Sequence, residues 1–252
     1  MMWINDDGIQ LSAILEEAVT EEAEGGEKQK RPLAILLHGF TSAKDRPHNI
    51  LAAAAMRGAG FDTLRFDLYG HGESGGEFRK HTLFKWISNT LAVIDYARAL
   101  GYTELVLSGH SQGGLVAALT AGMEADRVRG LVLRAPAFMI PQGARDGCLL
   151  GRPFDPEHIP DTFPVIKGLE LDGNYIRTAQ AIRVEDAAER FKKPVLILHG
   201  DEDDTVPLAV SREMAVRYEN CELAVMAGET HHFDRCPDQM RDIIRNWLAK
   251  QR

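Results

Sequence analysis

Short continuous runs of apolar residues recur along the chain and alternate with segments in which apolar residues follow a helical period. The apolar runs occupy residues 33–37, 105–107, 131–133 and 195–198, as in strands that are buried on both faces of a parallel sheet. Between them, residues 82–100 carry apolar side chains at positions 83, 84, 87, 91, 94 and 97, the spacing of one helix face. The alternation predicts an α/β protein with a mainly parallel sheet and helices on both faces.

Most of the remaining chain fits the same rhythm. Residues 3–16 alternate around the turn pair Asp7-Gly8, which predicts a hairpin. The charged segment 21–31 contains two consecutive glycines, and we expect it to be an exposed loop. The apolar run 131–133 belongs to a strand expected at 128–134, and two further strands are expected at 61–67 and 222–226. By the same periodicity and propensity arguments, further helices are expected at 50–60, 184–191, 208–218 and 237–250.

Residues 136–183 interrupt the alternation. This segment holds six of the eleven prolines, at positions 136, 141, 153, 156, 160 and 164, and no long apolar run. It is too long for a simple loop in a compact domain. We interpret it as a cap inserted over the strand ends, so that residues 1–135 and 184–252 form the core.

One strand-to-helix junction carries a candidate nucleophile. Gly109-His110-Ser111-Gln112-Gly113 matches the pattern G-x-S-x-G between an apolar strand and a helix rich in small residues. A serine on so tight a turn takes strained dihedral angles, so the residues two before and two after it must lack bulk. The turn presents the Ser111 hydroxyl at the sheet edge. It also directs the first free N–H groups of the helix toward the same place, where they suit a developing negative charge.

Two other glycine-containing turns lie at strand ends. The strand at 33–37 stops at His38-Gly39-Phe40, where glycine lets the backbone turn so that the next N–H faces a ligand. We expect the Phe40 N–H to be a second donor to an oxyanion. The glycine-rich loop 68–76 looks like a phosphate cradle, but it lacks the Lys-Ser/Thr ending of a P-loop. We interpret it as a structural turn.

A serine nucleophile needs an imidazole to accept its proton and a carboxylate to orient that imidazole. Two later loops follow apolar strands, and in a parallel sheet such loops gather at one edge. The spacing leaves the choice open between two histidines and among four acids: His231, His232, Asp201, Glu202, Asp203 and Asp204. A metal site in His231-His232-x-Asp234-x-Cys236 is the weaker alternative, because adjacent loop histidines rarely share one ion without a third well-placed ligand.

Composition and charge indicate which partners the protein is not expected to bind and which cell compartment suits it. The chain has 252 residues, a formal net charge of −8 and a pI near 5.6, which argues against nucleic acid or an anionic membrane as a partner. No run approaches the ~18 apolar residues that span a bilayer, and the first residues lack the pattern of a signal peptide. Three widely spaced cysteines, Cys148, Cys221 and Cys236, agree with a reducing compartment. We therefore expect a cytoplasmic protein.

Taken together, these motifs resemble the α/β-hydrolase superfamily and, within it, the bacterial feruloyl (cinnamoyl) esterases. The resemblance covers nearly the whole chain. Its carriers are His38-Gly39-Phe40, Asp67-x-x-Gly70-x-Gly72-x-Ser74, Gly109-His110-Ser111-Gln112-Gly113-Gly114, His199-Gly200-x-x-Asp203-x-x-Val206-Pro207 and Gly228-x-x-His231-x-Phe233. Within the cap, residues 154–161 and 173–177 point to the esterase subfamily.

The resemblance implies an α/β-hydrolase fold and a serine esterase that works through an acyl-enzyme, without cofactor or metal. Its catalytic triad falls on Ser111, Asp203 and His231, and its oxyanion N–H groups fall on Phe40 and Gln112. The expected partner is a small-molecule hydroxycinnamate ester. The resemblance also implies a homodimer.

The cap is expected to form the pocket for the aromatic acyl group. Candidate substrate contacts are Gly39, Asp146 and Tyr175; Gly143 stands where some relatives hold the phenol hydroxyl with a polar residue. A short-chain carboxylesterase or monoacylglycerol lipase would use the same triad with a more open apolar pocket. A non-catalytic binding protein on this scaffold is an alternative of another class, although such proteins usually lack a triad member. A peptidase is disfavoured because the sequence shows no acidic subsite for an amine.

Overall fold

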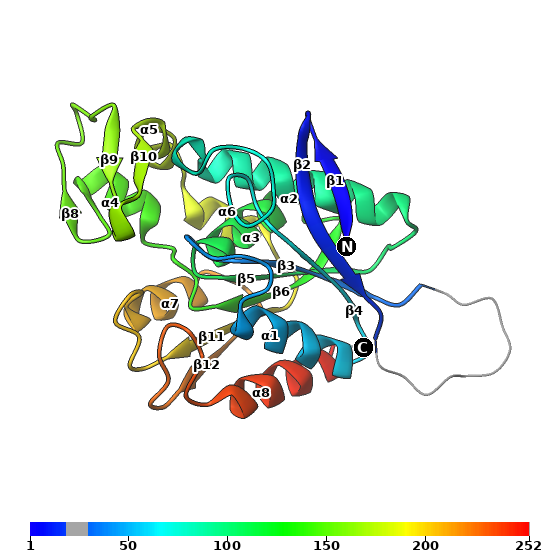
Figure 1. The fold of residues 1–252 in the computed structure, drawn as a ribbon. Helices are drawn as coiled ribbons and strands as arrows, with labels where there is room; N and C mark the ends of the chain where they lie inside the picture. Colours follow the sequence, from blue (N-terminus) through cyan, green and yellow to red (C-terminus); the bar gives the residue numbers. More distant parts are fainter. Residues whose placement is uncertain (19–29, 252) are drawn as a thin grey trace, which may run out of the picture.

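The computed structural model describes residues 1–18 and 30–251 of the chain. Within these residues, eight strands form the central sheet (Figure 1). The strands at one edge, β1 and β2, are antiparallel to their neighbours, and the other pairings are parallel. This confirms the mainly parallel α/β sheet. From edge to edge the strands are β1 (Met2–Asp6), β2 (Ile9–Glu16), β4 (Asp62–Phe66), β3 (Leu33–Leu37), β5 (Leu105–His110), β6 (Val128–Arg134), β11 (Val195–Gly200) and β12 (Cys221–Met226).

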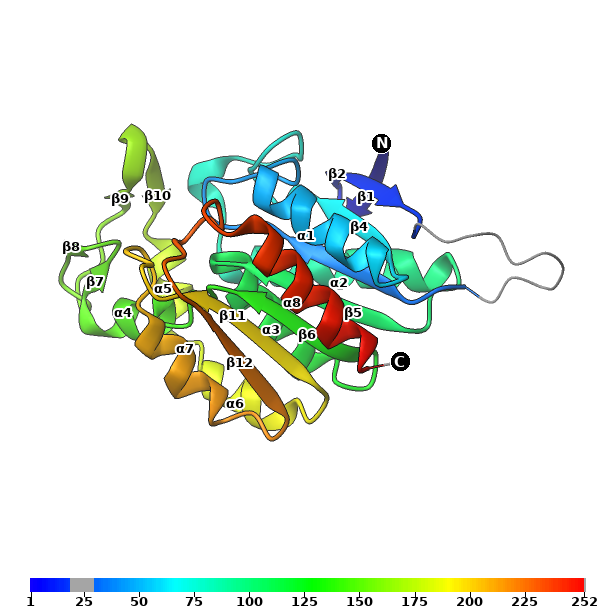
Figure 2. The same cartoon turned by 90° about the horizontal axis from the view of Figure 1, so that it is seen from below.

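Helices cover both faces of the sheet (Figures 1 and 2). On one face α1 (Pro47–Gly58) packs against α8 (Pro237–Ala249). On the other, α3 (Gln112–Met123) contacts both α2 (Leu83–Ala99) and α6 (Val184–Arg190). Two apolar clusters fill the space between the sheet and these layers, one including Trp86 and Phe191, the other Phe61 and Trp247. The remaining helix of the described core, α7 (Leu208–Ala215), contacts β11 and β12.

The expected elements are present, with shifts at their ends of up to three residues. The hairpin pairs Trp3 with Ser12 in antiparallel register. Helix α1 begins at Pro47 rather than at residue 50, because a proline at the first helical position has its φ preset and loses no helical hydrogen bond. The exposed loop expected at 21–31 lies largely outside the described residues.

The segment 136–183 forms a group of short elements at one end of the molecule (Figures 1 and 2). Helix α4 packs against α5, and β9 pairs with β10. Strand β10 also contacts η1 (Phe78–Lys80), a turn that precedes α2. The elements are α4 (Ile140–Asp146), β7 (Cys148–Leu149), β8 (Arg152–Pro153), β9 (Thr162–Pro164), the 3₁₀ turn η2 (Ile166–Gly168), β10 (Glu170–Asp172) and α5 (Asn174–Gln180).

None of the helices in residues 1–18 and 30–251 combines the length and the apolar character that a membrane-spanning helix needs.

Candidate active site

Ser111 forms the turn between β5 and α3. Its backbone has φ 54° and ψ −122°, a conformation that costs about 1–3 kcal/mol for a residue other than glycine. The Ser111 N–H donates to Arg134 O at 2.9 Å, which ties the turn to the end of β6. The surrounding sheet and helix therefore hold the serine in a strained conformation.

Two glycines let the strand, the turn and the helix pack backbone against backbone. A Cβ atom on Gly109 would lie 2.2 Å from Gly113 O, and one on Gly113 would lie 2.2 Å from His38 O. Both distances are far below van der Waals contact, which confirms that these positions must lack a side chain. Because His38 follows β3, the second contact also sets the loop that carries Phe40 directly against the Ser111 turn.

The structure brings Asp203 and His231 together at the same sheet edge. The His231 Nδ1–H donates to Asp203 Oδ2 at 2.7 Å, and the Asp203 side chain is fully buried. Asp203 follows β11 and His231 follows β12, which are neighbouring parallel strands. With its proton on Nδ1, His231 keeps a lone pair on Nε2 with which it can accept another proton.

The competing acids and the competing histidine have other partners. Asp201 accepts a hydrogen bond from Gly228 N–H, and Glu202 pairs with Arg235. The exposed Asp204 accepts from Thr205 Oγ1 at 3.1 Å. His232 is exposed and its N–H donates to Thr230 Oγ1. Among the four acids, Asp203 alone contacts either of the two candidate histidines in the described residues, and its partner is His231.

Asp203 is held ionised by hydrogen bonds. Burial alone would raise the pKa of this carboxyl, but donors from His199, His231 and the Val206 N–H hold it well below its usual range. His199 Nε2 lies 3.2 Å from Asp203 Oδ2, and the N–H groups of Thr205 and Val206 both reach Oδ1. An ionised carboxylate at this place fixes the tautomer of His231 and stabilises positive charge on it.

His110 links the nucleophile turn to the His231 loop. Its Nε2–H donates to His231 O at 2.8 Å, and the two rings lie 4.7 Å apart. Burial holds the pKa of His110 well below its ordinary value, so this imidazole is neutral and cannot compete as a base at neutral pH. Like His38, His71 and His199, it is a hydrogen-bonded residue near the sheet edge.

Phe40 and Gln112 are the two residues whose N–H groups are predicted to bind an oxyanion. Gln112 is the first residue of α3, and the first N–H groups of a helix have no partner within it. Phe40 belongs to the loop after β3, which His38 fixes by donating from Nδ1 to Gly39 O and accepting the Leu68 N–H at Nε2. Both Phe40 and Gln112 line the same cavity as Ser111.

That cavity has a volume of about 660 Å³ and lies between the nucleophile turn and segment 136–183. Most of its wall is apolar and comes from that segment, including Phe163 and Leu171. Its acidic lining residues are Asp146 and Asp204, and no Lys, Arg or His is among the described residues that line it. The site therefore offers an apolar chamber with a small number of polar groups.

The three candidate substrate contacts have different positions. Asp146 lines the cavity, and its carboxylate accepts from Gln142 Nε2 at 2.7 Å. Tyr175 lines it too, but its hydroxyl donates to Gln112 Oε1. Gly39 is not among the described residues that line the cavity. It packs against the nucleophile turn, since a Cβ atom added to Gly39 would lie 3.1 Å from Ser111 Cβ. Whether any of them contacts a substrate stays a prediction.

Among the residues that the structure describes, no group of three or more His, Cys, Asp or Glu side chains is arranged to hold a metal ion.

Comparison with known proteins identifies the family. A family model described as "Serine aminopeptidase, S33" matches residues 28–160. The solved structure of Est1E from Butyrivibrio proteoclasticus with ferulic acid bound is 43% identical, covers 100% of this chain and 99% of that chain, and superposes with a TM-score of 0.94. The chain belongs to the serine hydrolases of the α/β-hydrolase superfamily. Within them it is an esterase related to Est1E, which confirms the resemblance inferred from its motifs.

Two curated relatives of this hydrolase are more distant. The monoacylglycerol lipase of Mycolicibacterium smegmatis is 25% identical over 253 residues, covering 87% of this chain and 88% of that protein. Human Protein ABHD12B is 25% identical over 239 residues, and the match spans 87% of this chain but only 61% of the human protein.

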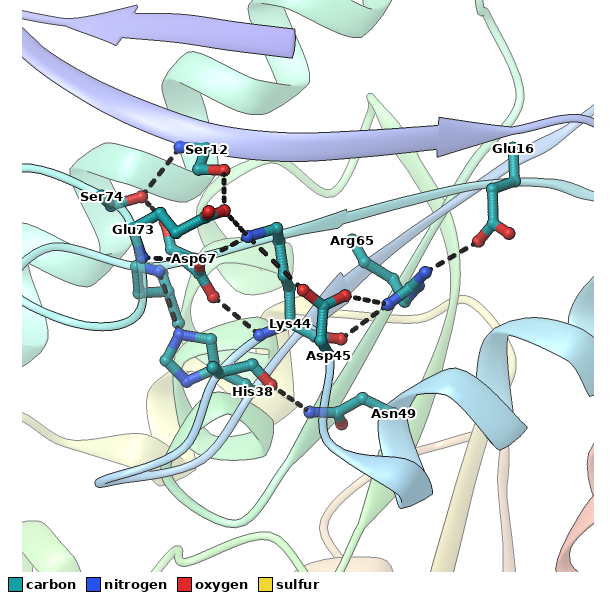
Figure 3. A network of polar contacts seen from close by, with 12 residues as sticks. Ser12, Glu16, His38, Lys44, Asp45, Asn49, Arg65, Asp67, Glu73 and Ser74 are labelled. Atoms are coloured by element: carbon teal, nitrogen blue, oxygen red, sulfur yellow. Dashed lines mark hydrogen bonds and ion pairs between the residues drawn. The ribbon is translucent and has the colours of Figure 1, made fainter. Parts of the chain in front are cut away.

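Sequence reasoning missed a buried ion pair that holds the Phe40 loop of this hydrolase (Figure 3). The side chains of Lys44 and Asp67 are each 1% exposed, and Lys44 Nζ lies 2.7 Å from Asp67 Oδ2 and 2.6 Å from Glu73 Oε2. The Lys44 N–H also donates to Asp67 Oδ1 at 2.7 Å. The pair therefore clamps the chain just beyond Phe40 onto the loop after β4.

The same carboxylate explains the glycine-rich loop 68–76. Asp67 accepts the Glu73 N–H at 3.0 Å, and a Cβ atom on Gly72 would lie 2.2 Å from the Asp67 carboxylate. Burial would raise the pKa of Asp67, but the N–H of Glu73 and the donors of Lys44 hold it below its ordinary value. The loop thus wraps around an ionised carboxylate, which supports its interpretation as a structural turn.

Proposed function

We propose that this hydrolase cleaves hydroxycinnamate esters through an acyl-enzyme on Ser111. The observation that carries the proposal is that Ser111 opens into an apolar cavity of about 660 Å³ beside the Asp203–His231 pair. This volume falls within the range of about 300–1,000 Å³ that is typical of small-molecule sites. The likeness to Est1E, whose solved structure holds ferulic acid, supports an aromatic acyl group.

In the first half of the reaction, the Ser111 hydroxyl attacks the ester carbonyl while His231 Nε2 accepts its proton. Asp203, already ionised and bonded to Nδ1, stabilises the imidazolium that forms. The N–H groups of Phe40 and Gln112 donate to the oxyanion of the tetrahedral intermediate. The imidazolium then protonates the leaving alcohol, and the acyl group stays on Ser111.

In the second half, water replaces the alcohol. His231 accepts a proton from the water as it attacks the acyl carbonyl, and the same two N–H groups stabilise the second oxyanion. Collapse of this intermediate returns the proton to Ser111 Oγ and releases the carboxylic acid. No group other than the side chains and N–H donors already described is needed.

The cavity lining supports a neutral, largely apolar acyl group. Its apolar residues suit an aromatic ring, and the Asp146–Gln142 pair gives polar groups suited to a phenol hydroxyl. The lining carboxylates would repel an anionic substrate. Hydroxycinnamate esters of neutral alcohols or sugars meet these conditions.

Residues 136–183 supply most of the cavity wall, and we propose that they act as a cap on a core formed by residues 1–135 and 184–252.

A homodimer, which the resemblance implies, is a separate prediction that light scattering of the purified protein tests.

A monoacylglycerol lipase or short-chain carboxylesterase is the second candidate. Two apolar residues of the cavity wall are also open to solvent, Leu150 at 49% and Ile166 at 39%. An apolar rim of this kind suits an aliphatic acyl chain, and the Mycolicibacterium smegmatis relative is named a monoacylglycerol lipase.

The deciding experiment compares methyl ferulate, p-nitrophenyl butyrate and monooleoylglycerol as substrates, with Ser111→Ala as the control. We expect turnover of methyl ferulate that the variant loses. Preference for monooleoylglycerol or butyrate would favour the second candidate, and activity retained in Ser111→Ala would contradict the assignment of the nucleophile.

A further inference from the structure

A buried hydrogen-bond relay connects α5 to the first residue of α3. The Tyr175 hydroxyl donates to Gln112 Oε1 at 2.8 Å, and Gln112 Nε2 lies 3.4 Å from His81 Nε2. His81 Nδ1 in turn lies 2.7 Å from Phe78 O. Tyr175 is 4% exposed, Gln112 1% and His81 0%, so water cannot replace these contacts at low cost.

Hydrogen-bond chemistry fixes the direction of the relay. Burial lowers the pKa of His81 to about 3, so its ring is neutral and carries one proton. That proton is on Nδ1, which faces a carbonyl oxygen, and Nε2 is therefore an acceptor for the Gln112 amide N–H. The Gln112 oxygen then faces Tyr175. Because burial raises the pKa of the Tyr175 hydroxyl, it keeps the proton that it donates.

Both ends of the Gln112 side chain are thus anchored, one by Tyr175 and the other by His81. The Gln112 backbone follows Ser111, whose φ of 54° is strained and persists only where its surroundings over-determine it. An anchored side chain on the next residue is such a constraint. It restricts rotation of the peptide unit between Ser111 and Gln112, which carries the Gln112 N–H.

We propose that Tyr175 is a positioning residue that aims the Gln112 N–H at the oxyanion through the Gln112 side chain. The inference rests on the proposed function in one respect, the use of that N–H in the oxyanion hole. Tyr175 belongs to α5 of the cap, whereas the Gln112 N–H that it positions belongs to α3 of the core. The cap would therefore contribute to turnover as well as to substrate binding.

The test is a double-variant cycle of Tyr175→Phe and Gln112→Ala, since alanine keeps the backbone N–H and removes only the side chain. Tyr218→Phe is the matched control, because the Tyr218 hydroxyl is buried without a hydrogen-bond partner among the described residues. Three substrates are compared. The esters p-nitrophenyl butyrate and methyl cinnamate have no free phenol hydroxyl, and methyl ferulate has one.

We expect each single variant to lower kcat about 10-fold on all three substrates with KM changed less than two-fold, a fraction of the ~10²–10³-fold loss that follows removal of an oxyanion donor. The double variant should fall no further, because the two changes break one relay. The Ki of a trifluoromethyl ketone, whose serine adduct places an oxyanion in the hole, should rise by the same factor. The Tyr218→Phe control should stay within two-fold of the wild type.

Three results would overturn the proposal. A multiplicative loss of about 100-fold in the double variant would show that Tyr175 and Gln112 act separately, and a loss confined to methyl ferulate would mean that Tyr175 contacts the phenol. If Tyr175→Phe does not fold, Gln112→Ala alone must show the kcat loss at unchanged KM, or the proposal fails. A wild type inactive on methyl ferulate would contradict the proposed substrate and leave the cycle on p-nitrophenyl butyrate intact.

Discussion

The two walls of the cavity are built in different ways. On the core side, the turn at Ser111 is packed backbone to backbone, and a single added Cβ at Gly109 or Gly113 would lie 2.2 Å from a carbonyl oxygen. On the cap side, the wall consists of short elements, and Leu150 and Ile166 are both partly open to solvent. The core wall tolerates almost no change of shape, whereas the cap wall has room for other side chains.

This difference separates chemistry from specificity. The groups that we assign to bond making need positions held within a fraction of an ångström, and rigid elements with buried hydrogen bonds supply such positions. A substrate wall needs only a shape and a polarity, which a loop-rich segment can change without disturbing the sheet. Substitutions in the core wall should therefore abolish turnover or folding, and substitutions in the cap wall should alter substrate preference.

The largest effect is expected from Asp203→Asn in the core wall. An amide at this position can donate to His231 Nδ1 and would stabilise the wrong tautomer, a change that lowers turnover about 10⁴-fold in a serine protease with the same triad. We expect a loss of the same order in kcat on methyl ferulate. Some loss of stability should accompany it, because the lowered pKa of Asp203 means that its ionised form stabilises the folded protein, and circular dichroism checks that the variant is folded. Steady-state kinetics at high enzyme concentration measure the loss in kcat.

The matched control is Asp204→Asn, which removes a neighbouring carboxylate that is exposed and contacts Thr205. Its activity on methyl ferulate should stay within about two-fold of the wild type, since an exposed charge contributes little through solvent. Equal losses in the two variants would contradict the assignment of Asp203.

The next test concerns folding of the core wall. Gly113→Ala would place a Cβ atom 2.2 Å from His38 O, and backbone must move to relieve the overlap. We expect a loss of at least about 3 kcal/mol in the free energy of unfolding, measured by urea denaturation. Gly58→Ala is the control, because its Cβ would have 3.6 Å of clearance at the end of α1 and alanine is the better helix former. A Gly113→Ala protein as stable as the control would show that the turn is not tightly packed.

The buried ion pair behind Phe40 gives a smaller effect. Lys44→Met leaves the Asp67 carboxylate buried without its cation, a change that typically lowers the free energy of unfolding by about 3–5 kcal/mol. Because two backbone N–H groups still donate to Asp67, we expect a loss at the lower end of this range. Lys80→Met removes an exposed pair with Glu77 and should change the free energy of unfolding by less than about 1 kcal/mol. Urea midpoints at pH 7 compare the two variants.

The pH dependence of stability tests the same pair independently. The pKa of Asp67 is lower in the folded protein than in the unfolded chain. Its contribution is therefore fully present above the unfolded pKa, about 3.9, and is lost as the pH falls through the lower folded value. We expect Lys44→Met to lose less stability than the wild type between pH 5 and strongly acidic solution. A parallel decline of the two proteins would contradict the role given to Lys44.

The sequence predicted the parts of the fold that depend on local pattern. Continuous apolar runs identified the inner strands, and the glycines around Ser111 identified the nucleophile turn because close backbone packing requires them. Spacing alone left four consecutive acids open, and the resemblance assigned the triad acid to Asp203 through the motif His199-Gly200-x-x-Asp203-x-x-Val206-Pro207. The turn in which the Asp203 carboxylate accepts the N–H groups of Thr205 and Val206 is visible only in the structure.

Contacts between residues far apart in the chain account for what was missed. Lys44 stands between Ala43 and Asp45 in a polar stretch, and nothing local distinguishes it from an exposed lysine. Its partner Asp67 is 23 residues away, and Tyr175 is 63 residues from Gln112. Propensity and periodicity describe neighbours along the chain, so they cannot identify such pairs.

The smallest effect tests the charge of the cavity wall, which should affect substrate preference rather than the turnover of neutral esters. Asp204 and Asp146 line the cavity without a described cation in its wall, so an ester whose alcohol carries a carboxylate should be a poorer substrate than its neutral analogue. A unit charge about 8 Å away in a water-like medium contributes about 0.5 kcal/mol. Asp204→Asn should therefore raise the ratio of kcat/KM for caffeoylquinate to that for methyl caffeate about two- to threefold.

Salt provides the internal control, because screening of exposed charges shortens from about 10 Å at 0.1 M to about 3 Å at 1 M. The preference of the wild type for methyl caffeate should weaken at 1 M salt, and the difference from Asp204→Asn should disappear. A ratio unaffected by the substitution and by salt would mean that the cavity selects the alcohol by shape alone. Specificity would then depend on apolar residues such as Leu150 and Ile166, and charge would have no part in it.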